Sequence, residues 1–316
     1  MSIKTAVIVV AGFGTRFAPA TKEQPKEMFP IGNKPIVHHI VEQLADAGIE
    51  SFILVTRPNE HTTQRYFARN STYENHLRKK GKTELLAEFE KISSLGHFSS
   101  TPQDEQLGDG HALLEGLFNR SRTESYMVVF PDFLVRPDEK IFSRMLAAFD
   151  EHYAPIIAMD EAPVEELGNY GVLGFEDVAS PVKKISRLVE KPKHPNEAPS
   201  RCFSIGYTIV TPELISYLLK AKSTVSDGEI RIADALSQML QDGKDVYGIQ
   251  LKNRGYDCGQ PAGLLRANID FALRGPDGAE IEEMLLEICT ELSKSQVDKF
   301  ATNSSKLNDP LGSLLV

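Results

Sequence analysis

The sequence predicts an α/β fold built on a Rossmann-like, doubly wound mixed sheet. Two continuous apolar runs, residues 7–10 and 52–56, are typical of strands covered on both faces, as in a parallel sheet. Residues 35–48 between them place apolar side chains at helical spacing and close with a glycine. A glycine-containing loop follows the first run directly, at the strand end where open α/β sheets bind ligands.

Later elements continue this alternation and then change character. The predicted elements are strands at residues 126–130, 156–159, 172–175, 184–189 and 203–210, and a helix at 137–149. After Gly171 the predicted strands are mixed with two helical stretches. We therefore expect one large domain over residues 1–275, with a first half of about 1–160 and a second half of about 161–275.

Two amphipathic stretches complete the predicted elements. Residues 69–92 carry mixed charge with apolar side chains at helical spacing, which predicts either a solvated surface helix or a helical insertion. Residues 276–316 are predicted to form a C-terminal helical extension and a polar tail with an apolar end at 311–316. The apolar stripe of this extension suits subunit contacts and packing within the chain equally well.

Composition limits the classes of partner. The chain has 316 residues, a formal net charge of -9, and three cysteines, which are too few and too scattered for a disulfide framework or a zinc site. The acidic balance argues against nucleic acid, and neither a signal peptide nor an apolar run of membrane length is present. We therefore expect a cytoplasmic protein with no nucleic-acid or membrane partner.

The first loop has the chemistry of a phosphate-binding loop. Residues 7–30 read VIVVAGFGTRFAPATKEQPKEMFP, and Gly12 and Gly14 let backbone N–H groups approach anionic oxygens. Its cations are Arg16, Lys22 and Lys26. Phe17 stands where a dinucleotide fingerprint needs its third glycine, and the GK[ST] of a Walker loop is absent, so neither motif fits. Phe17 likewise disfavours a dinucleotide-binding oxidoreductase.

The loop resembles the nucleotide-binding signature of the sugar-1-phosphate nucleotidylyltransferases, and within them that of the UTP–glucose-1-phosphate uridylyltransferases. Further motifs follow in the family's order: QLGDGHA at 106–112, FPDFLV at 130–135, NYGVL at 169–173, VEKPK at 189–193, DGEIRIADA at 227–235 and YDCG at 256–259. The resemblance implies a glycosyltransferase-A-like catalytic domain over residues 1–275, with a nucleotide half and a sugar half. Its implied reaction forms UDP-glucose and pyrophosphate from UTP and glucose 1-phosphate, with Mg²⁺ as cofactor.

The resemblance also assigns roles to individual residues. The implied nucleotide-binding residues are Ala11, Gly12, Gly14, Thr15, Arg16, Lys26, Gln103, Gly108 and Asp132. The implied sugar-phosphate-binding residues are Gly171, Glu190, Lys191, Gly206 and Glu229. The implied catalytic residues are Arg16, Lys26, Asp132, Lys191 and Asp257, of which Asp132 and Asp257 would hold the metal.

Three of these residues can also be interpreted from their local sequence. Asp132 follows a predicted strand directly, where a carboxylate can bind Mg²⁺ or cap a turn. Glu229 can accept hydrogen bonds from sugar hydroxyls or be favoured by a helix dipole. Lys191 precedes Pro192, so we expect its backbone to be extended and its side chain to project into a cleft.

The base-binding region leaves alternatives. Gln106 is a rival to Gln103 for the uracil edge, which a glutamine amide suits because it offers both a donor and an acceptor. Asp109 stands where the family commonly has leucine, near the expected base or ribose, and His111 is assigned no chemistry. The alternatives are therefore an enzyme that uses dTTP or another sugar 1-phosphate, and a catalytically silent regulatory homologue. The resemblance also implies a homodimer or homotetramer.

Overall fold

The chain forms two compact units, residues 1–264 and residues 265–316. The computed structural model describes residues 3–176, 180–221 and 228–307, without the side chains of residues 294–307. Asp227 and the apolar end at 311–316 lie outside the described residues. The predicted boundary after residue 275 falls between the two helices of the second unit, α9 (Pro261–Leu273, which begins in the first unit) and α10 (Gly278–Leu307).

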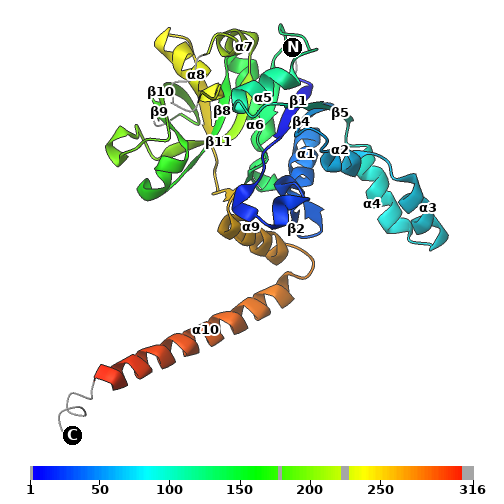
Figure 1. Cartoon of the computed structure of the whole chain (residues 1–316), viewed down its shortest axis with the longest axis vertical. Coiled ribbons are helices and arrows are strands. Elements are labelled where there is room, and N and C mark those ends of the chain that lie inside the picture. The colour runs from blue at the N-terminus through cyan, green and yellow to red at the C-terminus, as the bar shows by residue number, and fades with distance from the viewer. Residues whose placement is uncertain (1–2, 177–179, 222–227, 308–316) are drawn as a thin grey trace. The chain divides into compact units, whose positions relative to one another are not determined.

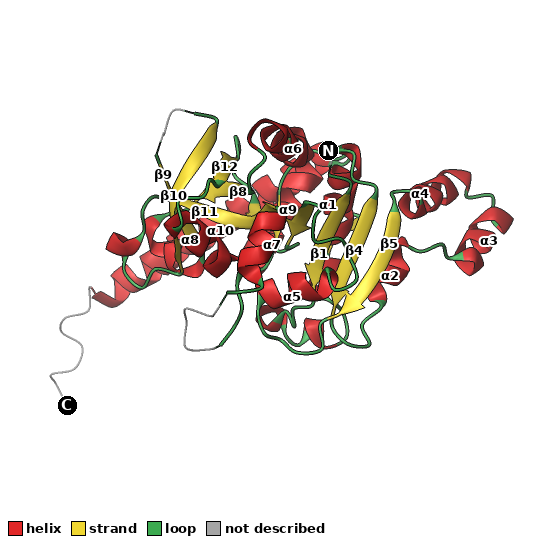
Figure 2. Cartoon of the chain, turned by 90° about the horizontal axis from the view of Figure 1, so that it is seen from above, coloured by secondary structure: helices red, strands yellow, loops and turns green. Residues whose placement is uncertain are grey.

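A nine-stranded mixed sheet forms the centre of the first unit among the described residues, in the order β5-β4-β1-β6-β11-β8-β12-β10-β9 (Figure 2). Its strands are β1 (Thr5–Val10), β4 (Ser51–Thr56), β5 (His97–Pro102), β6 (Tyr126–Val129), β8 (Ile156–Glu161), β9 (Gly171–Phe175), β10 (Val182–Glu190), β11 (Cys202–Val210) and β12 (Tyr247–Gln250). Strand β1 pairs in parallel with β4 and β6, whereas β11 runs antiparallel between β6 and β8. The predicted mixed α/β sheet is therefore confirmed.

The helices of the first unit that lie entirely within it are α1 (Ile36–Asp46), α2 (Thr62–Phe67), α3 (Ser71–Lys79), α4 (Thr83–Ser93), α5 (Asp109–Gly116), α6 (Ile141–His152), α7 (Pro212–Leu218) and α8 (Ile232–Gln241). The single helix predicted at 69–92 is two helices, because Gly81 adopts a φ of 68° between α3 and α4. Both extend beyond the β5 edge of the sheet (Figures 1 and 2). The helix predicted at 137–149 is likewise split, into a 3-10 turn at Pro137–Glu139 and α6.

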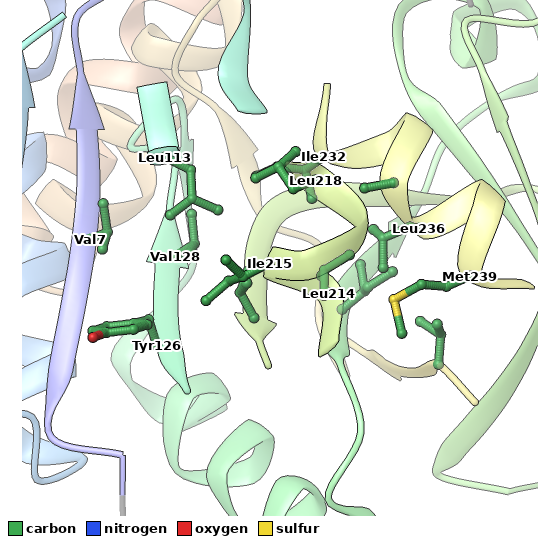
Figure 3. Close-up of a cluster of buried hydrophobic side chains, with 14 of the residues drawn as sticks. Val7, Leu113, Tyr126, Val128, Leu214, Ile215, Leu218, Ile232, Leu236 and Met239 are labelled. Carbon is green, nitrogen blue, oxygen red and sulfur yellow. The ribbon is translucent and has the colours of Figure 1, made fainter. Parts of the chain in front are cut away.

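The core lies between the sheet and helices α5, α7 and α8. Val7 and Val128 of the sheet belong to one buried cluster with Leu113, Ile215 and Leu236 from these three helices (Figure 3). Because side chains alternate along a strand, the neighbouring buried residues of β1 face the opposite side, where α1 and α6 lie (Figure 2). Truncating one such leucine to alanine typically costs about 2–5 kcal/mol, so this cluster fixes the scaffold beneath the loops.

A two-stranded ribbon stands at the carboxyl end of β6. It pairs β7 (Phe133–Leu134) with β13 (Tyr256–Asp257) in antiparallel register, with Asp257 opposite Phe133. A second short ribbon pairs β2 (Pro30–Ile31) with β3 (Lys34–Pro35) just before α1. In the described part of the chain, none of the helices is both long enough and apolar enough to cross a membrane.

Candidate active site

The glycine loop after β1 wraps around the Lys26 side chain. Gly14 adopts a φ of 63°, and a Cβ placed on it would lie 2.9 Å from Cγ2 of Thr21. The Thr21 hydroxyl donates to the Gly14 carbonyl at 2.9 Å, which closes the turn. A Cβ on Gly12 would lie 3.6 Å from Nζ of Lys26. Gly12 therefore leaves open space beside the Lys26 ammonium group, and Gly14 leaves it beside the stem of the same side chain, as suits a phosphate-binding loop.

Lys26 makes an ion pair with Asp132. Nζ of Lys26 lies 2.6 Å from Oδ2 and 2.5 Å from Oδ1 of Asp132, which follows β6 at its carboxyl end. The Lys26 side chain is 19% exposed and the Asp132 side chain 43% exposed, so the pair is accessible from the solvent. The structure thus brings the loop lysine and the predicted metal aspartate together.

Asp257 faces Asp132 across the β7–β13 ribbon. The N–H of Gly259 donates both to the Asp132 carbonyl and to Oδ1 of Asp257, each at 3.0 Å. A Cβ on Gly259 would lie 3.0 Å from Oδ1 of Asp257 and 3.6 Å from Oδ2 of Asp132. Both carboxylates therefore lie beside Gly259, and the space between them is open because this residue has no side chain.

This pair of carboxylates fits a magnesium ion. Mg²⁺ prefers oxygen ligands and is commonly held by one or two carboxylates together with water and substrate phosphate. The ammonium group of Lys26 already occupies a cation position beside Asp132. No group of three or more His, Cys, Asp or Glu residues suited to a metal occurs within the described ranges. Asp132 and Asp257 would supply two of the ligands of a bound Mg²⁺ and leave the other positions to water and phosphate.

Tyr170 orients Asp257, although the sequence assigned it no role. Its hydroxyl donates to Oδ2 of Asp257 at 3.0 Å, and its ring stacks on Phe203 with centroids 4.2 Å apart. Burial, and then the Asp257 carboxylate, raise the pKa of Tyr170 well above its usual range, so the hydroxyl stays a donor. The positive charge of Arg16 acts to lower the pKa of Tyr170, so this exposed residue lies near Tyr170.

Lys191 lies in a turn directly after β10. Its φ is 44°, so the prediction of an extended backbone before Pro192 was wrong. The cause is a tertiary contact: β10 ends at Glu190, and the N–H of Lys191 donates to the Tyr170 carbonyl at 3.0 Å. Nζ of Lys191 lies 3.7 Å from Oε1 of Glu190.

Two of the predicted sugar-site residues meet across a strand pair. Gly171 lies opposite Glu190 in the β9–β10 ladder, and a Cβ on Gly171 would lie 2.8 Å from Oε2 of Glu190. Burial raises the pKa of Glu190. Gly206 adopts a φ of 82° at a register break in β11, and its carbonyl accepts the N–H of Phe130 at 3.1 Å. Gly206 thus allows close backbone approach beside the carboxyl end of β6, and Gly171 leaves space for the Glu190 carboxylate.

Gln103 and Gly108 are also in contact. Gln103 is 2% exposed, whereas Gln106 is exposed. Nε2 of Gln103 lies 3.1 Å from the Gly108 carbonyl, to which it donates, and 3.3 Å from Nδ1 of His111. These contacts hold the amide nitrogen, so the Gln103 oxygen is the atom left to accept from a base. His111 therefore positions Gln103, a role that its sequence context did not indicate.

Asp109 joins the two halves of the first unit. Its Oδ1 accepts the N–H of Ile232 at 2.9 Å, at the first turn of α8. Burial raises the pKa of Asp109 to about 6. The carboxylate that replaces the family's leucine is therefore engaged by the start of a helix, which it stabilises.

The segment beside Asp109 carries Glu229. Its carboxylate accepts from Nη2 of Arg231 at 2.8 Å. A Cβ on Gly108 would lie 2.4 Å from the Ile230 carbonyl, so Gly108 and the segment before α8 are in direct backbone contact. Of the remaining predicted residues, Ala11 is buried and Thr15 is exposed in a 3-10 turn at Thr15–Phe17.

The fold and the lysine–aspartate centre at the end of β6 define a nucleotidyltransferase. A family model described as Nucleotidyl transferase matches residues 5–273, and the chain belongs to this family. A UTP–glucose-1-phosphate uridylyltransferase from Pseudomonas aeruginosa is 34% identical over 84% of this chain and 94% of its own length.

Solved structures agree with this assignment. The UTP-bound UGPase from Acinetobacter baumannii has a TM-score of 0.81 and 32% identity over 90% of this chain and 99% of its own. A UDP-glucose pyrophosphorylase complexed with UDP-glucose has a TM-score of 0.75 and 32% identity over 86% and 100%. The resemblance to the uridylyltransferases is therefore confirmed.

Proposed function

We propose that this enzyme transfers a uridylyl group from UTP to glucose 1-phosphate, giving UDP-glucose and pyrophosphate. One observation carries the proposal: Lys26, Asp132 and Asp257 converge at the carboxyl end of β6, beside a bare glycine loop. The relatives named above as acting on or binding these molecules support the same choice of substrates.

The reaction is a direct in-line displacement. A phosphate oxygen of glucose 1-phosphate attacks the α-phosphorus of UTP, and the bond to the pyrophosphate oxygen breaks. Both reactants are anionic, so positioning and positive charge supply most of the catalysis. Arg16 and Lys26 hold the triphosphate and stabilise the leaving pyrophosphate, while Lys191 holds the sugar phosphate.

Asp132 and Asp257 would hold the magnesium ion. When bound, Mg²⁺ neutralises phosphate charge and polarises the phosphorus that is attacked. In the chain itself, Lys26 exchanges its contact with Asp132 for one with the triphosphate. The negative charge of Asp132 would then be balanced by Lys26 before the substrate arrives and by the magnesium ion afterwards.

Gln103 would read the base. With its amide nitrogen held by the Gly108 carbonyl and His111, Gln103 presents its oxygen as an acceptor. The N3–H of uracil supplies the matching donor, whereas N3 of cytosine is an acceptor and would face the oxygen unpaired. Glu190 and Glu229 would accept hydrogen bonds from the sugar hydroxyls, and Gly171 and Gly206 leave space for the ring.

A substrate grid tests the proposal. Pyrophosphate release with Mg²⁺ is measured for UTP, dTTP, CTP, ATP and GTP, each against the 1-phosphates of glucose, galactose, mannose and N-acetylglucosamine. We expect the highest rate with UTP and glucose 1-phosphate. A different best pair would contradict the proposed substrates and point to the dTTP- or other sugar-1-phosphate enzyme.

A catalytically silent regulatory homologue is the alternative outcome. It predicts no pyrophosphate release from any pair, although the folded protein still binds a nucleotide sugar. It also predicts that Asp132→Ala and Lys191→Ala leave the biological effect intact, since neither residue would carry chemistry. Loss of that effect in both variants excludes the regulatory homologue.

The remaining expectations concern the setting. We propose a cytoplasmic enzyme that acts as a homodimer or homotetramer and binds neither nucleic acid nor membrane. The unpaired cysteines Cys202, Cys258 and Cys289 support a reducing compartment. Light scattering coupled to size exclusion measures the assembly, and cell fractionation measures the location.

A further inference from the structure

Residues 251–255 carry the chain from β12 to Asp257, and other segments hold four of their backbone N–H groups, those of Leu251, Lys252, Asn253 and Gly255. The N–H of Leu251 donates to the Met159 carbonyl at 2.9 Å, which extends the β12–β8 pairing by one bond. The following residues have no strand partner until β13 begins at Tyr256. A segment of this kind needs acceptors from side chains or water, because unpaired backbone groups are costly.

Glu139 supplies most of these acceptors. Its Oε1 accepts from the backbone N–H and from Nδ2 of Asn253, both at 2.6 Å. Its Oε2 accepts from the N–H of Lys252 at 3.0 Å and from Nη1 of Arg144 at 3.2 Å. Arg144 in turn donates to the Gln250 carbonyl at 2.8 Å. Glu139 is 3% exposed, so these are buried, charge-assisted hydrogen bonds.

Asp160 holds the end of the same segment. Its Oδ2 accepts the N–H of Gly255 at 2.9 Å, and its Oδ1 accepts the N–H of Glu161 at 2.8 Å. Asp160 is 7% exposed and lies near the end of β8. A Cβ on Gly255 would lie 2.2 Å from Cε1 of Phe133, the residue that pairs with Asp257. The bond to Asp160 therefore keeps this glycine against the ribbon that carries the site.

We propose that Glu139 and Asp160 form a carboxylate clamp that sets the position of Asp257 opposite Asp132. Both are positioning residues, because the segment that they hold ends at the β7–β13 ribbon, which carries Asp257. Neither carboxylate is part of the proposed substrate site. The inference rests on the proposed function, in that Asp132 and Asp257 are taken to hold Mg²⁺. Residues that orient metal ligands typically change metal affinity or activity by about 10–100-fold when mutated.

The first test uses Glu139→Gln and Asp160→Asn, which keep size but lose charge and one acceptor. We expect the Mg²⁺ concentration for half-maximal pyrophosphate release to rise by about 10-fold or more, with a lower kcat. The KM for glucose 1-phosphate should stay unchanged, because Lys191 and Glu190 are held by other contacts. A role in folding alone would lower Tm and leave the Mg²⁺ dependence of the folded enzyme unaltered.

A second variant guards against loss of folding. Asn253→Asp changes an exposed residue and places a negative charge against Oε1 of Glu139, so it weakens the clamp from the outside. We expect a shift in Mg²⁺ dependence in the same direction. Glu166→Gln is the matched control, because Glu166 is an exposed carboxylate whose contact with this segment is a long one, 3.9 Å to Arg254.

Metal binding gives a readout apart from activity. Mn²⁺ titration followed by electron paramagnetic resonance, with UDP-glucose present, should show weaker Mn²⁺ binding in the three clamp variants and wild-type binding in Glu166→Gln. Unchanged Mn²⁺ affinity and unchanged Mg²⁺ dependence in folded variants would overturn the clamp. If wild-type protein releases no pyrophosphate from any substrate pair, the proposed function fails instead, and the Mn²⁺ titration alone decides the clamp.

Discussion

Lys26 and Asp132, 106 residues apart in the chain, form an ion pair in which Nζ lies 2.6 Å from Oδ2. The contact joins the glycine loop to the end of β6 and gives Asp132 a cation before any substrate is bound. For Asp132 to hold the proposed Mg²⁺, Lys26 would first have to leave the Asp132 carboxylate.

Lys26→Met should separate these two effects. The variant loses a cation that stabilises the leaving pyrophosphate, so we expect kcat to fall by about 10²–10³-fold. Asp132 is released at the same time, so Mn²⁺ should bind the ligand-free variant more tightly than it binds wild type. Lys80→Met, which removes an exposed cation outside this loop, is the control and should change neither quantity. Weaker Mn²⁺ binding in Lys26→Met would contradict the exchange.

Tyr170→Phe should weaken the metal site without unfolding it. The substitution removes the hydrogen bond to Asp257 and keeps the ring stacked on Phe203. A hydrogen bond to a charged group is worth about 1.5–3 kcal/mol, so we expect kcat to fall by about 10-fold or more. Steady-state kinetics at varied Mg²⁺ measures this. Tyr217→Phe is the control, because its hydroxyl also donates to a carboxylate, Asp242, at 2.8 Å but at the surface.

Gln103→Leu should alter base recognition alone. We expect kcat/KM for UTP to fall by about 10–100-fold, because a polar base edge is left unpaired, with the KM for glucose 1-phosphate unchanged. The preference for UTP over CTP should fall as well. Initial rates with both nucleotides measure these effects. Gln106→Leu should match wild type, since that residue is exposed. An equal loss of kcat/KM for UTP in both variants would contradict the assignment of Gln103 to the base.

Glu27→Gln should change the pH dependence of stability. Burial raises the pKa of Glu27 to about 8, and neither carboxylate oxygen has a hydrogen-bond partner among the described residues. In the unfolded chain Glu27 has its usual pKa of about 4.5, so the folded state loses stability as pH rises from there to about 8. The slope contributed by this one group is about 1.4 kcal/mol per pH unit.

The glutamine variant removes that slope, because an amide does not titrate. We expect Glu27→Gln to gain stability relative to wild type between pH 5 and pH 7, as measured by urea unfolding of the ligand-free protein at several pH values. Glu23→Gln, an exposed residue of the same loop, should follow wild type at every pH. Parallel pH profiles for wild type and Glu27→Gln would show that the Glu27 carboxyl is ionised in the folded state.

The fold class and the glycine loop after β1 were predictable because their signals are local. Apolar runs mark buried strands whatever their neighbours are, and the first loop combines glycines and cations within 24 residues, 7–30. The mixed sheet and the order of the motifs followed from such patterns and from the family resemblance. Splitting of the helix at 69–92 could have been read from Gly81, which lies near its middle.

The contacts that complete the site were decided by tertiary structure. Lys26 and Asp132 meet because β1 and β6 are neighbours in the sheet. Neither sequence motif indicates that these two strands pair. Lys191 departs from the extended backbone that Pro192 favours, because its N–H donates a hydrogen bond to the Tyr170 carbonyl. Local preferences are worth about a kcal/mol, so one long-range hydrogen bond in a packed site can outweigh them.

The sequence by itself determined which side chains can carry the chemistry: the loop cations, the two aspartates and the motif glycines. Tertiary structure decided which carboxylates face the candidate site and which only hold the segment that leads to it. Asp257 faces the site, whereas Glu139 and Asp160 accept N–H groups of the segment that precedes it. A carboxylate has the same charge and acceptors in either role, and only its depth and its neighbours, set by packing across the whole sheet, distinguish the two.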